Sequence, residues 1–394
     1  MKLFVLGNIN SGKSYIINKF QKNLPSYKVL KIDEYRKETC DGSLEAEMKM
    51  WLSFPEEVVK YDDVIVELSG GGKVAENILK ELEENSFVVL KVNADLETCL
   101  KRNEIKDFSK TPYPKEFSTP IDAVIRKIDT DMNNGSIERL WNKAIKIFDV
   151  ESNCDISKLP LQHYHQLFKL KHALTSFKGS LFTFGSTARG EMKISSDVDL
   201  FFLTTVEKAE ILKKLNEQFT DVRLMGNEFV IRENGVLLEM NYINDIQDAY
   251  YFYSTGSIEK PTKTILKDDF KIIDDLKIAA KKQPDLKKEI EFIIERLNYY
   301  IESLKSIIVK GDEYKFYFHN NIIVHEYVKL KAFINGVTER LYLPLMVKEY
   351  LTKDEWKDIL YFFGKDQITH YNIVRKMGDD IIYVVEKILK DKYK

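Results

Sequence analysis

Two short segments of this chain combine residue types and spacing that could carry chemistry on phosphates. The first, Gly7 to Ser14 (GNINSGKS), fits the pattern GxxxxGK[ST] at every fixed position. Such glycines let the backbone turn tightly and point its N–H groups at phosphate oxygens, while Lys13 can reach the β- and γ-phosphates and Ser14 can bind Mg²⁺. The second segment carries Asp197 and Asp199, whose carboxylates share one face if the segment is a strand. The sequence therefore predicts two nucleotide sites.

The first segment has the context that its pattern requires. An apolar run precedes it and a helix-forming segment follows it, so a favourable helix dipole would face the phosphates. A glycine-rich turn that binds nothing is the alternative. The predicted nucleotide-binding residues are Gly7, Asn8, Ile9, Asn10, Ser11, Gly12, Lys13 and Ser14.

Charged residues that follow the predicted strands extend the first site. Asp33 and Arg36 come just after the second strand, where ligands bind in open α/β sheets. Asp33 could accept the proton of an acceptor hydroxyl, and Arg36 could hold an anionic acceptor. Glu67 ends the third strand and is suited, with Ser14, to hold Mg²⁺ or its water. Arg102, in a charged stretch after the fourth strand, could stabilise a transferred phosphoryl group, although ordinary solvated charge is the alternative.

These features resemble the P-loop kinase superfamily over residues 1–150. The resemblance identifies a nucleoside triphosphate site, with Lys13, Asp33 and Arg102 as catalytic candidates and Arg102 in a lid. Strands are predicted at Lys2–Leu6, Lys28–Ile32, Asp63–Leu68 and Phe87–Val92, and helices at Lys13–Asn23, Val74–Glu84 and Ser136–Phe148. This alternation predicts an α/β domain with a parallel sheet.

A glycine–serine turn precedes the two aspartates of the second segment. Gly185 and Ser186 follow the apolar run LFTF, and SSDVDLFFL brings Asp197 and Asp199. Adjacent like charges are costly unless they are neutralised, and Mg²⁺ with oxygen ligands neutralises them. The turn offers N–H groups and a hydroxyl to a triphosphate. An exposed strand of alternating charge is the alternative.

This second run resembles the nucleotidyltransferase superfamily related to DNA polymerase β, in its minimal and aminoglycoside-type forms, over about residues 160–280. The resemblance implies that both aspartates bind Mg²⁺ or Mn²⁺, and that Ser186 contacts the phosphates with Arg189 in support. It also implies a third carboxylate on a later strand. The best match is Glu239 in VLLEM, as metal ligand or general base, and Glu228 and Glu233 compete for this position.

The rest of the chain sets the predicted organisation. An α+β domain at 160–280, which opens with a helix at Gln162–Phe177, follows the P-loop domain at 1–150, and a helical bundle follows at 281–394. The other elements are predicted as strands at Leu181–Phe184, Asp221–Leu224 and Leu237–Tyr242, and as helices at Glu207–Phe219, Glu289–Ile308 and Tyr317–Ile334.

Composition restricts the partners and the compartment. The chain has 394 residues with 60 basic and 62 acidic side chains, so a bulk electrostatic drive toward nucleic acid or anionic membrane is absent. The cysteines lack metal-binding spacing, and no apolar run is long enough to cross a membrane, so a cytoplasmic location is expected.

The two motifs together predict a bifunctional enzyme that uses ATP or another nucleoside triphosphate. One site would transfer a γ-phosphoryl group, and the other would transfer a nucleoside monophosphate to a hydroxyl or phosphate. The acceptor could be a small molecule or an RNA end, and near-neutral charge favours the small molecule. Two alternatives stay open: a transferase that adds AMP to a protein, in the manner of an antitoxin, and a P-loop that acts only as a regulatory switch. The sequence leaves the oligomeric state open.

Overall fold

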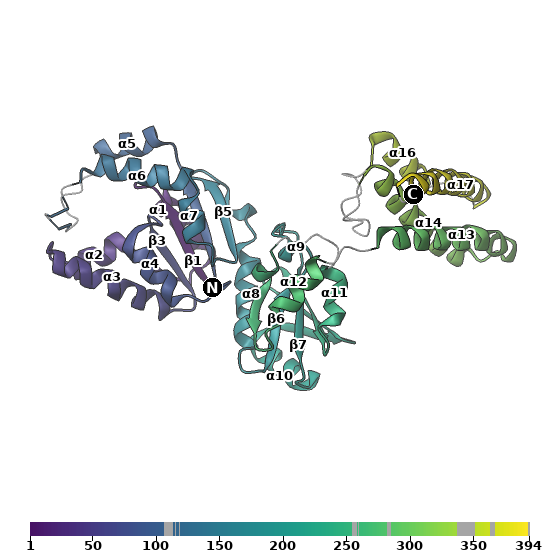
Figure 1. The fold of residues 1–394 in the computed structure, drawn as a ribbon. Helices are drawn as coiled ribbons and strands as arrows, with labels where there is room; N and C mark the ends of the chain where they lie inside the picture. Colours follow the sequence, from purple (N-terminus) through teal and green to yellow (C-terminus); the bar gives the residue numbers. More distant parts are fainter. Residues whose placement is uncertain are drawn as a thin grey trace. The chain divides into compact units, whose positions relative to one another are not determined.

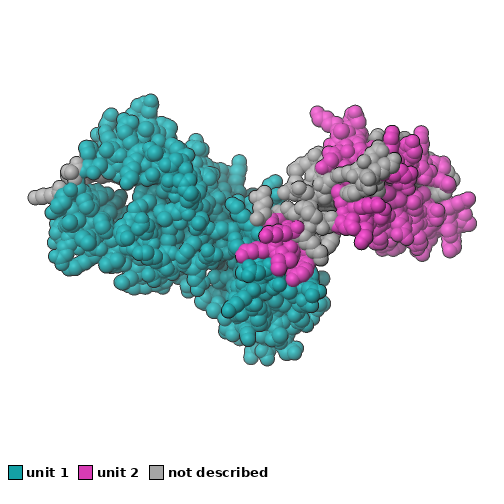
Figure 2. All heavy atoms as spheres, viewed as in Figure 1, with its two compact units in different colours: residues 1–249, 260–275 teal, residues 250–259, 276–394 magenta. Residues whose placement is uncertain are grey.

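The computed structural model describes residues 1–105, 113–114, 116–117, 119–253, 258, 260–281, 285–336, 351–362 and 367–392. The chain forms two compact units, drawn in different colours in Figure 2: residues 1–249 with 260–275, and residues 250–259 with 276–394. The first unit contains both predicted nucleotide sites. Domain boundaries at 1–150, 160–280 and 281–394 remain a proposal.

A five-stranded parallel sheet forms the N-terminal part of the first unit, as predicted (Figure 1). Its order is β2-β3-β1-β4-β5, and every neighbouring pair is parallel. The strands are β1 (Lys2–Gly7), β2 (Lys28–Lys31), β3 (Val64–Leu68), β4 (Phe87–Asn93) and β5 (Lys146–Glu151). The helices are α1 (Lys13–Asn23), α2 (Ile32–Thr39), α3 (Leu44–Val59), α4 (Gly72–Glu81), α5 (Leu96–Ile105), α6 (Ile121–Asn133) and α7 (Ser136–Leu140).

Apolar residues cover both faces of this sheet, which explains why its strands read as continuous hydrophobic runs. Successive side chains of a strand point to opposite faces. In β1, Leu3 and Val5 join a core with α1, whereas Phe4 and Leu6 join a separate core with α3, α4 and α7.

The helix predicted at Ser136–Phe148 is wrong beyond its first turns. Helix α7 ends at Leu140, and strand β5 begins at Lys146. Strand β5 is the edge of the sheet and pairs only with β4 among the described strands, and all of its residues except Val150 are partly or fully exposed. Its few apolar residues continue the helical spacing of α7 by coincidence.

A six-stranded mixed sheet forms the rest of the first unit. Its order is β11-β6-β7-β10-β9-β8, in which β7 and β10 are parallel and the other neighbours are antiparallel. The strands are β6 (Gly179–Thr183), β7 (Val198–Thr204), β8 (Asp221–Met225), β9 (Glu228–Glu233), β10 (Val236–Ile243) and β11 (Ile265–Asp268). Helices α8 (Leu161–Ala173), α9 (Gly185–Ala188) and α10 (Lys208–Gln218) accompany it.

Helix α8 joins the cores of the two sheets. Its buried residues Leu161, Tyr164, Leu167 and Leu170 belong to one continuous apolar cluster that includes side chains of both sheets. The Tyr164 ring packs edge-on against Phe148 of β5 at a centroid distance of 5.8 Å. The two sheets of the first unit are therefore joined by a common hydrophobic core as well as by the covalent chain.

The second unit is helical, as predicted. Asp285 caps the first turn of α13 by accepting a hydrogen bond from the Lys288 N–H, and Gly311 ends the helix in the left-handed conformation. No helix among the described residues is both long and apolar enough to span a bilayer. The main helices are α13 (Leu286–Lys310), α14 (Glu313–Ile334), α16 (Lys353–Phe362) and α17 (Gln367–Lys392), while α11 (Gln247–Tyr253) and α12 (Ile273–Lys281) each straddle the boundary between the units.

Candidate functional sites

The loop from Gly7 to Ser14 connects β1 to α1 in the form of a phosphate cradle. Gly12 has a φ of 96° and Asn10 a φ of 64°, the left-handed conformations that a tight loop requires. The Lys13 ammonium lies across the loop and donates hydrogen bonds to the carbonyl oxygens of Gly7 and Asn8, at 2.9 and 2.7 Å. Its charge is therefore held over the place where phosphates would bind.

The two predicted metal ligands of this loop meet. The Ser14 hydroxyl lies 3.0 and 3.2 Å from the carboxylate oxygens of Glu67, at the end of β3. A hydroxyl and a carboxylate in contact are a suitable donor pair for Mg²⁺. The structure also brings Arg102 of α5 to the loop, where its guanidinium donates to the Asn10 carbonyl at 2.8 Å. The stretch from 106 to 112, which follows Arg102 in the predicted lid, lies outside the described residues.

Asp33 and Arg36 lie in α2, but Arg36 does not have the role expected from the sequence. Its guanidinium is only 8% exposed and pairs with the buried Glu47, with an Nε–Oε2 distance of 2.9 Å. A further N–H donates to Asp33 at 2.8 Å. Arg36 is thus occupied by two carboxylates and holds Asp33 in place, rather than offering an open anion site. The role of Glu47 could not be predicted from the sequence, because no motif distinguishes a single buried glutamate within a helix.

A cavity of about 890 Å³ connects these groups. Lys13, Arg102 and Ser152 line it, and so do Asp33 and Tyr113. The Tyr113 hydroxyl donates to Asp33 at 3.2 Å, so Asp33 has one polar partner on each side. The volume lies within the range of pockets that take small molecules. Phosphate-binding groups and a carboxylate suited to an acceptor hydroxyl therefore share one cavity.

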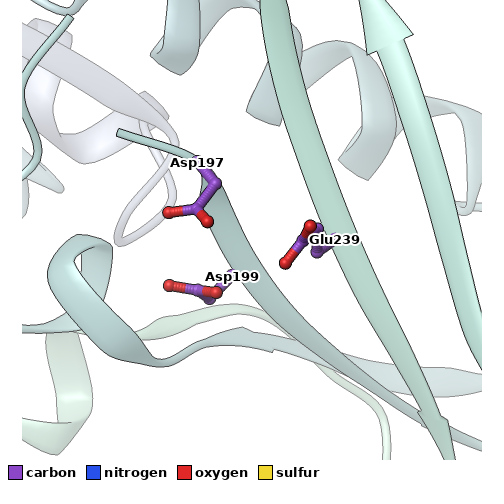
Figure 3. A group of neighbouring side chains, drawn as sticks. All are labelled: Asp197, Asp199 and Glu239. Atoms are coloured by element: carbon purple, nitrogen blue, oxygen red, sulfur yellow. The ribbon is translucent and has the colours of Figure 1, made fainter. Parts of the chain in front are cut away.

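The second site is a cluster of three carboxylates. Asp197, Asp199 and Glu239 each offer an oxygen, and these oxygens lie within 4.8 Å of one another. Figure 3 shows the three groups converging, Asp197 from just before β7, Asp199 from β7 and Glu239 from the neighbouring β10. The parallel ladder sets Glu239 directly opposite Asp199. This spacing suits a divalent cation with oxygen ligands.

The electrostatics of the cluster also fit a cation. Burial, together with the charges of Asp197 and Glu239, raises the pKa of Asp199 to about 7. Burial and the charges of Glu228 and Asp197 raise the pKa of Glu239 as well. Ionised carboxylates this close repel, so the cluster destabilises the metal-free fold as the pH rises from about 4 to about 7. A bound cation would remove that penalty.

The Gly185–Ser186 turn lies against the carboxylates. Gly185 has a φ of 60°, and a Cβ built on it would lie 2.0 Å from an Asp199 oxygen. The Ser186 hydroxyl is buried without a hydrogen-bond partner among the residues that the structure describes. Buried polar groups normally have a partner, so this hydroxyl is a candidate to bind a ligand. The Arg189 guanidinium pairs with Glu191 at 2.8 Å, and its charge lowers the pKa of Asp199 against the larger raising effects.

The two competitors for the third carboxylate lie elsewhere. Glu233 bonds Lys169 at 2.9 Å and also accepts from the backbone and hydroxyl of Thr220. These hydrogen bonds outweigh burial and lower the pKa of Glu233 to about 2, which marks a structural ion pair. Glu228 lies on β9 outside the cluster, although its charge reaches Glu239. Of the three candidates, geometry favours Glu239.

The close approach at Gly185 gives a testable prediction. We expect Gly185→Ala to lower nucleotidyl transfer about 100-fold, since the new methyl group would displace the Asp199 carboxylate. Gly226→Ala is the matched control, because Gly226 also has a positive φ but has open space where the Cβ would lie. Steady-state assays of both variants check this. Equal losses in the two variants would show that backbone strain, and not the contact with Asp199, is responsible.

The raised pKa of Asp199 gives a second prediction. A proton and a metal ion compete for this carboxylate, so we expect Mn²⁺ to bind about tenfold more weakly at pH 6 than at pH 8. Calorimetric titration measures both affinities, and the Asp197→Ala variant supplies the background from the Ser14–Glu67 pair. Equal affinities at the two pH values would contradict the prediction.

Comparison with known proteins gives one family and several distant structures. The solved structures include shikimate kinase from Bacteroides thetaiotaomicron, at 12% identity and a TM-score of 0.28 over 44% of this chain and 98% of that one. A nucleotidyltransferase-like protein from Exiguobacterium sibiricum 255-15 matches at 11% identity and a TM-score of 0.29, over 58% of this chain and 76% of that one. TM-scores this low carry no argument about this chain. The parallel sheet with its glycine loop and the mixed sheet with its carboxylates are described from their own strand orders and motifs.

The family match concerns the middle of the chain. No curated protein matches the sequence in the corresponding comparison. Residues 169–311 match the family model described as a nucleotidyltransferase domain, over less than half of the chain. These residues include the glycine–serine turn, both aspartates and Glu239. The protein therefore carries a nucleotidyltransferase domain and is a transferase.

Proposed function

We propose that this protein is a bifunctional enzyme that transfers a nucleoside monophosphate at the second site and a γ-phosphoryl group at the first. The observation that carries the nucleotidyl-transfer part of the proposal is the group of three carboxylates beside the Ser186 hydroxyl, which has no hydrogen-bond partner among the residues that the structure describes. The phosphoryl-transfer part is supported by the Lys13 ammonium held over the loop and by the contact of Ser14 with Glu67.

Nucleotidyl transfer assigns a task to each group of the second site. The acceptor oxygen bonds to the α-phosphorus of the triphosphate, the bond from that phosphorus to the bridging oxygen breaks, and pyrophosphate leaves. Glu239 would either take the acceptor proton or serve as the third metal ligand. Ser186 and the N–H groups of its turn would hold the phosphates. Mg²⁺ or Mn²⁺ at the carboxylates would neutralise the charge that develops on the phosphate oxygens.

Phosphoryl transfer assigns comparable tasks at the first site. The acceptor oxygen bonds to the γ-phosphorus, the bond to the β,γ-bridging oxygen breaks, and the nucleoside diphosphate leaves. Asp33, which lines the cavity, would take the acceptor proton, and its hydrogen bonds from Arg36 and Tyr113 would orient it. Lys13 and Arg102 would stabilise the charge on the transferred group.

The acceptor that we favour is a small hydroxylated molecule. The net charge of −2 gives no general attraction for a polyanion. Arg36, which lines the cavity beside Asp33, is neutralised by Glu47 and Asp33, and this also weakens the case for a strongly anionic acceptor. An RNA end and a protein side chain remain as the alternatives that the experiment must separate.

Two labels in parallel test the proposal. The protein is incubated with γ-labelled and α-labelled ATP and GTP and Mg²⁺, in a cell extract that is then separated into RNA, protein and small molecules. We expect both labels in new small-molecule products that are separated from the unreacted nucleotides and are absent from extract without the protein. Label in RNA or protein would change the acceptor, and the absence of any labelled product beyond that of the extract alone would contradict enzymatic transfer.

A further inference from the structure

The three carboxylates are not fixed in the same way. Asp199 and Glu239 are opposite residues of the β7–β10 ladder, and the Asp199 carbonyl also accepts from the Phe184 N–H at 3.1 Å. Asp197 precedes β7, which begins at Val198, and its side chain is exposed. The sheet therefore fixes two of the carboxylates, and the third needs a separate anchor.

That anchor is the turn immediately before Asp197. The Ser196 N–H donates to the Lys193 carbonyl at 3.1 Å, and the Lys193 N–H donates back to the Ser196 hydroxyl at 3.0 Å. These bonds close the turn on itself. They do not tie it to the rest of the fold, so the turn could still move as a unit relative to β7.

His163 supplies the tie. Its Nε2 lies 3.0 Å from the Ser196 carbonyl oxygen, the last carbonyl before Asp197. A carbonyl only accepts, so Nε2 carries the proton and the neutral ring has its lone pair on Nδ1. The ring is 4% exposed, and burial lowers the pKa of His163, in agreement with a neutral donor.

The helix that carries His163 is itself well held. Leu167 and Leu170 of α8 are fully buried in the core that joins the two sheets. The hydrogen bond from His163 therefore connects the turn to one of the most firmly packed elements of the first unit. A donor on such an element can hold a carbonyl within the few tenths of an ångström that a metal site requires.

We propose that His163 is a positioning residue that holds Asp197 at the distance from Asp199 and Glu239 at which the three carboxylates bind one divalent cation. The inference rests on the proposed function of this site. It assigns His163 no contact with substrate. Partners of this kind, one step removed from a metal, change affinity about 10- to 100-fold when they are removed.

Direct Mn²⁺ binding by calorimetry tests the inference without an assay of activity. We expect His163→Leu to weaken Mn²⁺ binding about tenfold, and His163→Gln, whose amide can donate to the same carbonyl, to recover most of the loss. His172→Leu, on the same helix but exposed, is the matched control and should bind as the wild type does.

A second variant keeps the test decisive if His163→Leu does not fold. His163→Phe keeps a planar ring at this buried position but donates no hydrogen bond to the Ser196 carbonyl, so it should weaken Mn²⁺ binding about tenfold by the same mechanism. Wild-type affinity in His163→Leu, or in His163→Phe if the first variant is unfolded, would overturn the inference and leave the proposed function intact. If the wild type itself binds no Mn²⁺ at these carboxylates, the proposed function fails first.

Discussion

Asp199→Asn is expected to lower nucleotidyl transfer about a thousandfold or more, a loss that corresponds to roughly 4 kcal/mol of transition-state stabilisation. Asp199 shares its chain segment with Asp197 and lies opposite Glu239 in the β7–β10 ladder. Asparagine has nearly the same shape, so the fold should persist while one anionic ligand is lost. Release of labelled pyrophosphate measures the rate.

The same substitution separates the two activities. We expect γ-phosphoryl transfer by Asp199→Asn to equal that of the wild type, because the first site uses none of these carboxylates. Asp221→Asn is the matched control, since Asp221 is a partly exposed carboxylate on β8, at the far edge of the same sheet. A nucleotidyl transfer rate within a few-fold of the wild type in Asp199→Asn would refute the assignment of this site.

Both motifs could be found from the sequence because each is local. In the first, the glycines, Lys13 and Ser14 lie within one loop, and in the second, Asp197 and Asp199 lie two residues apart on the chain. The chemical role of such a segment can be predicted because its functional residues are close together in the sequence. The positions of most strands and the helical second unit were also predicted from the hydrophobic pattern, because most buried strands here are short apolar runs.

Strand β9 was not predicted, although the sequence carries a turn motif that indicates it. Strand β9 has only Phe229 to Ile231 as an apolar run between charges, but Asn234-Gly235 directly after it is a strong hairpin signal. Both residues have positive φ values, 51° and 79°, as the turn requires. Recognising it would have placed β9 against β10 and would have left Glu228 and Glu233 on the neighbouring strand.

The residues that support the sites from a distance could not be predicted. Glu47 contacts Arg36 from another helix, and His163 contacts Ser196 from a helix that precedes its whole sheet in the sequence. Their roles depend on tertiary contacts between residues whose separation in the sequence follows no pattern. Residues that perform the chemistry can therefore be predicted from the sequence more readily than residues that hold them in position.

Lys13→Met is expected to lower γ-phosphoryl transfer about a thousandfold, because it removes the ammonium that lies over the loop while keeping most of the length of the side chain. Lys13 donates hydrogen bonds to two loop carbonyls, so its reach covers the cradle. We expect nucleotidyl transfer to continue at the wild-type rate, measured with the α-label in the same reactions. The melting temperature of the variant reports whether the loop still folds.

Lys22→Met controls for the general loss of a positive charge from the same helix, since Lys22 is an exposed residue in the last turn of α1. Its phosphoryl transfer should match that of the wild type. If Lys13→Met folds and still transfers the γ-label normally, the loop is not a kinase site and a regulatory nucleotide switch becomes the better account. If both labels are lost together, the two sites depend on each other, and the shared core around α8 is the physical connection through which nucleotide binding at one site would influence the other.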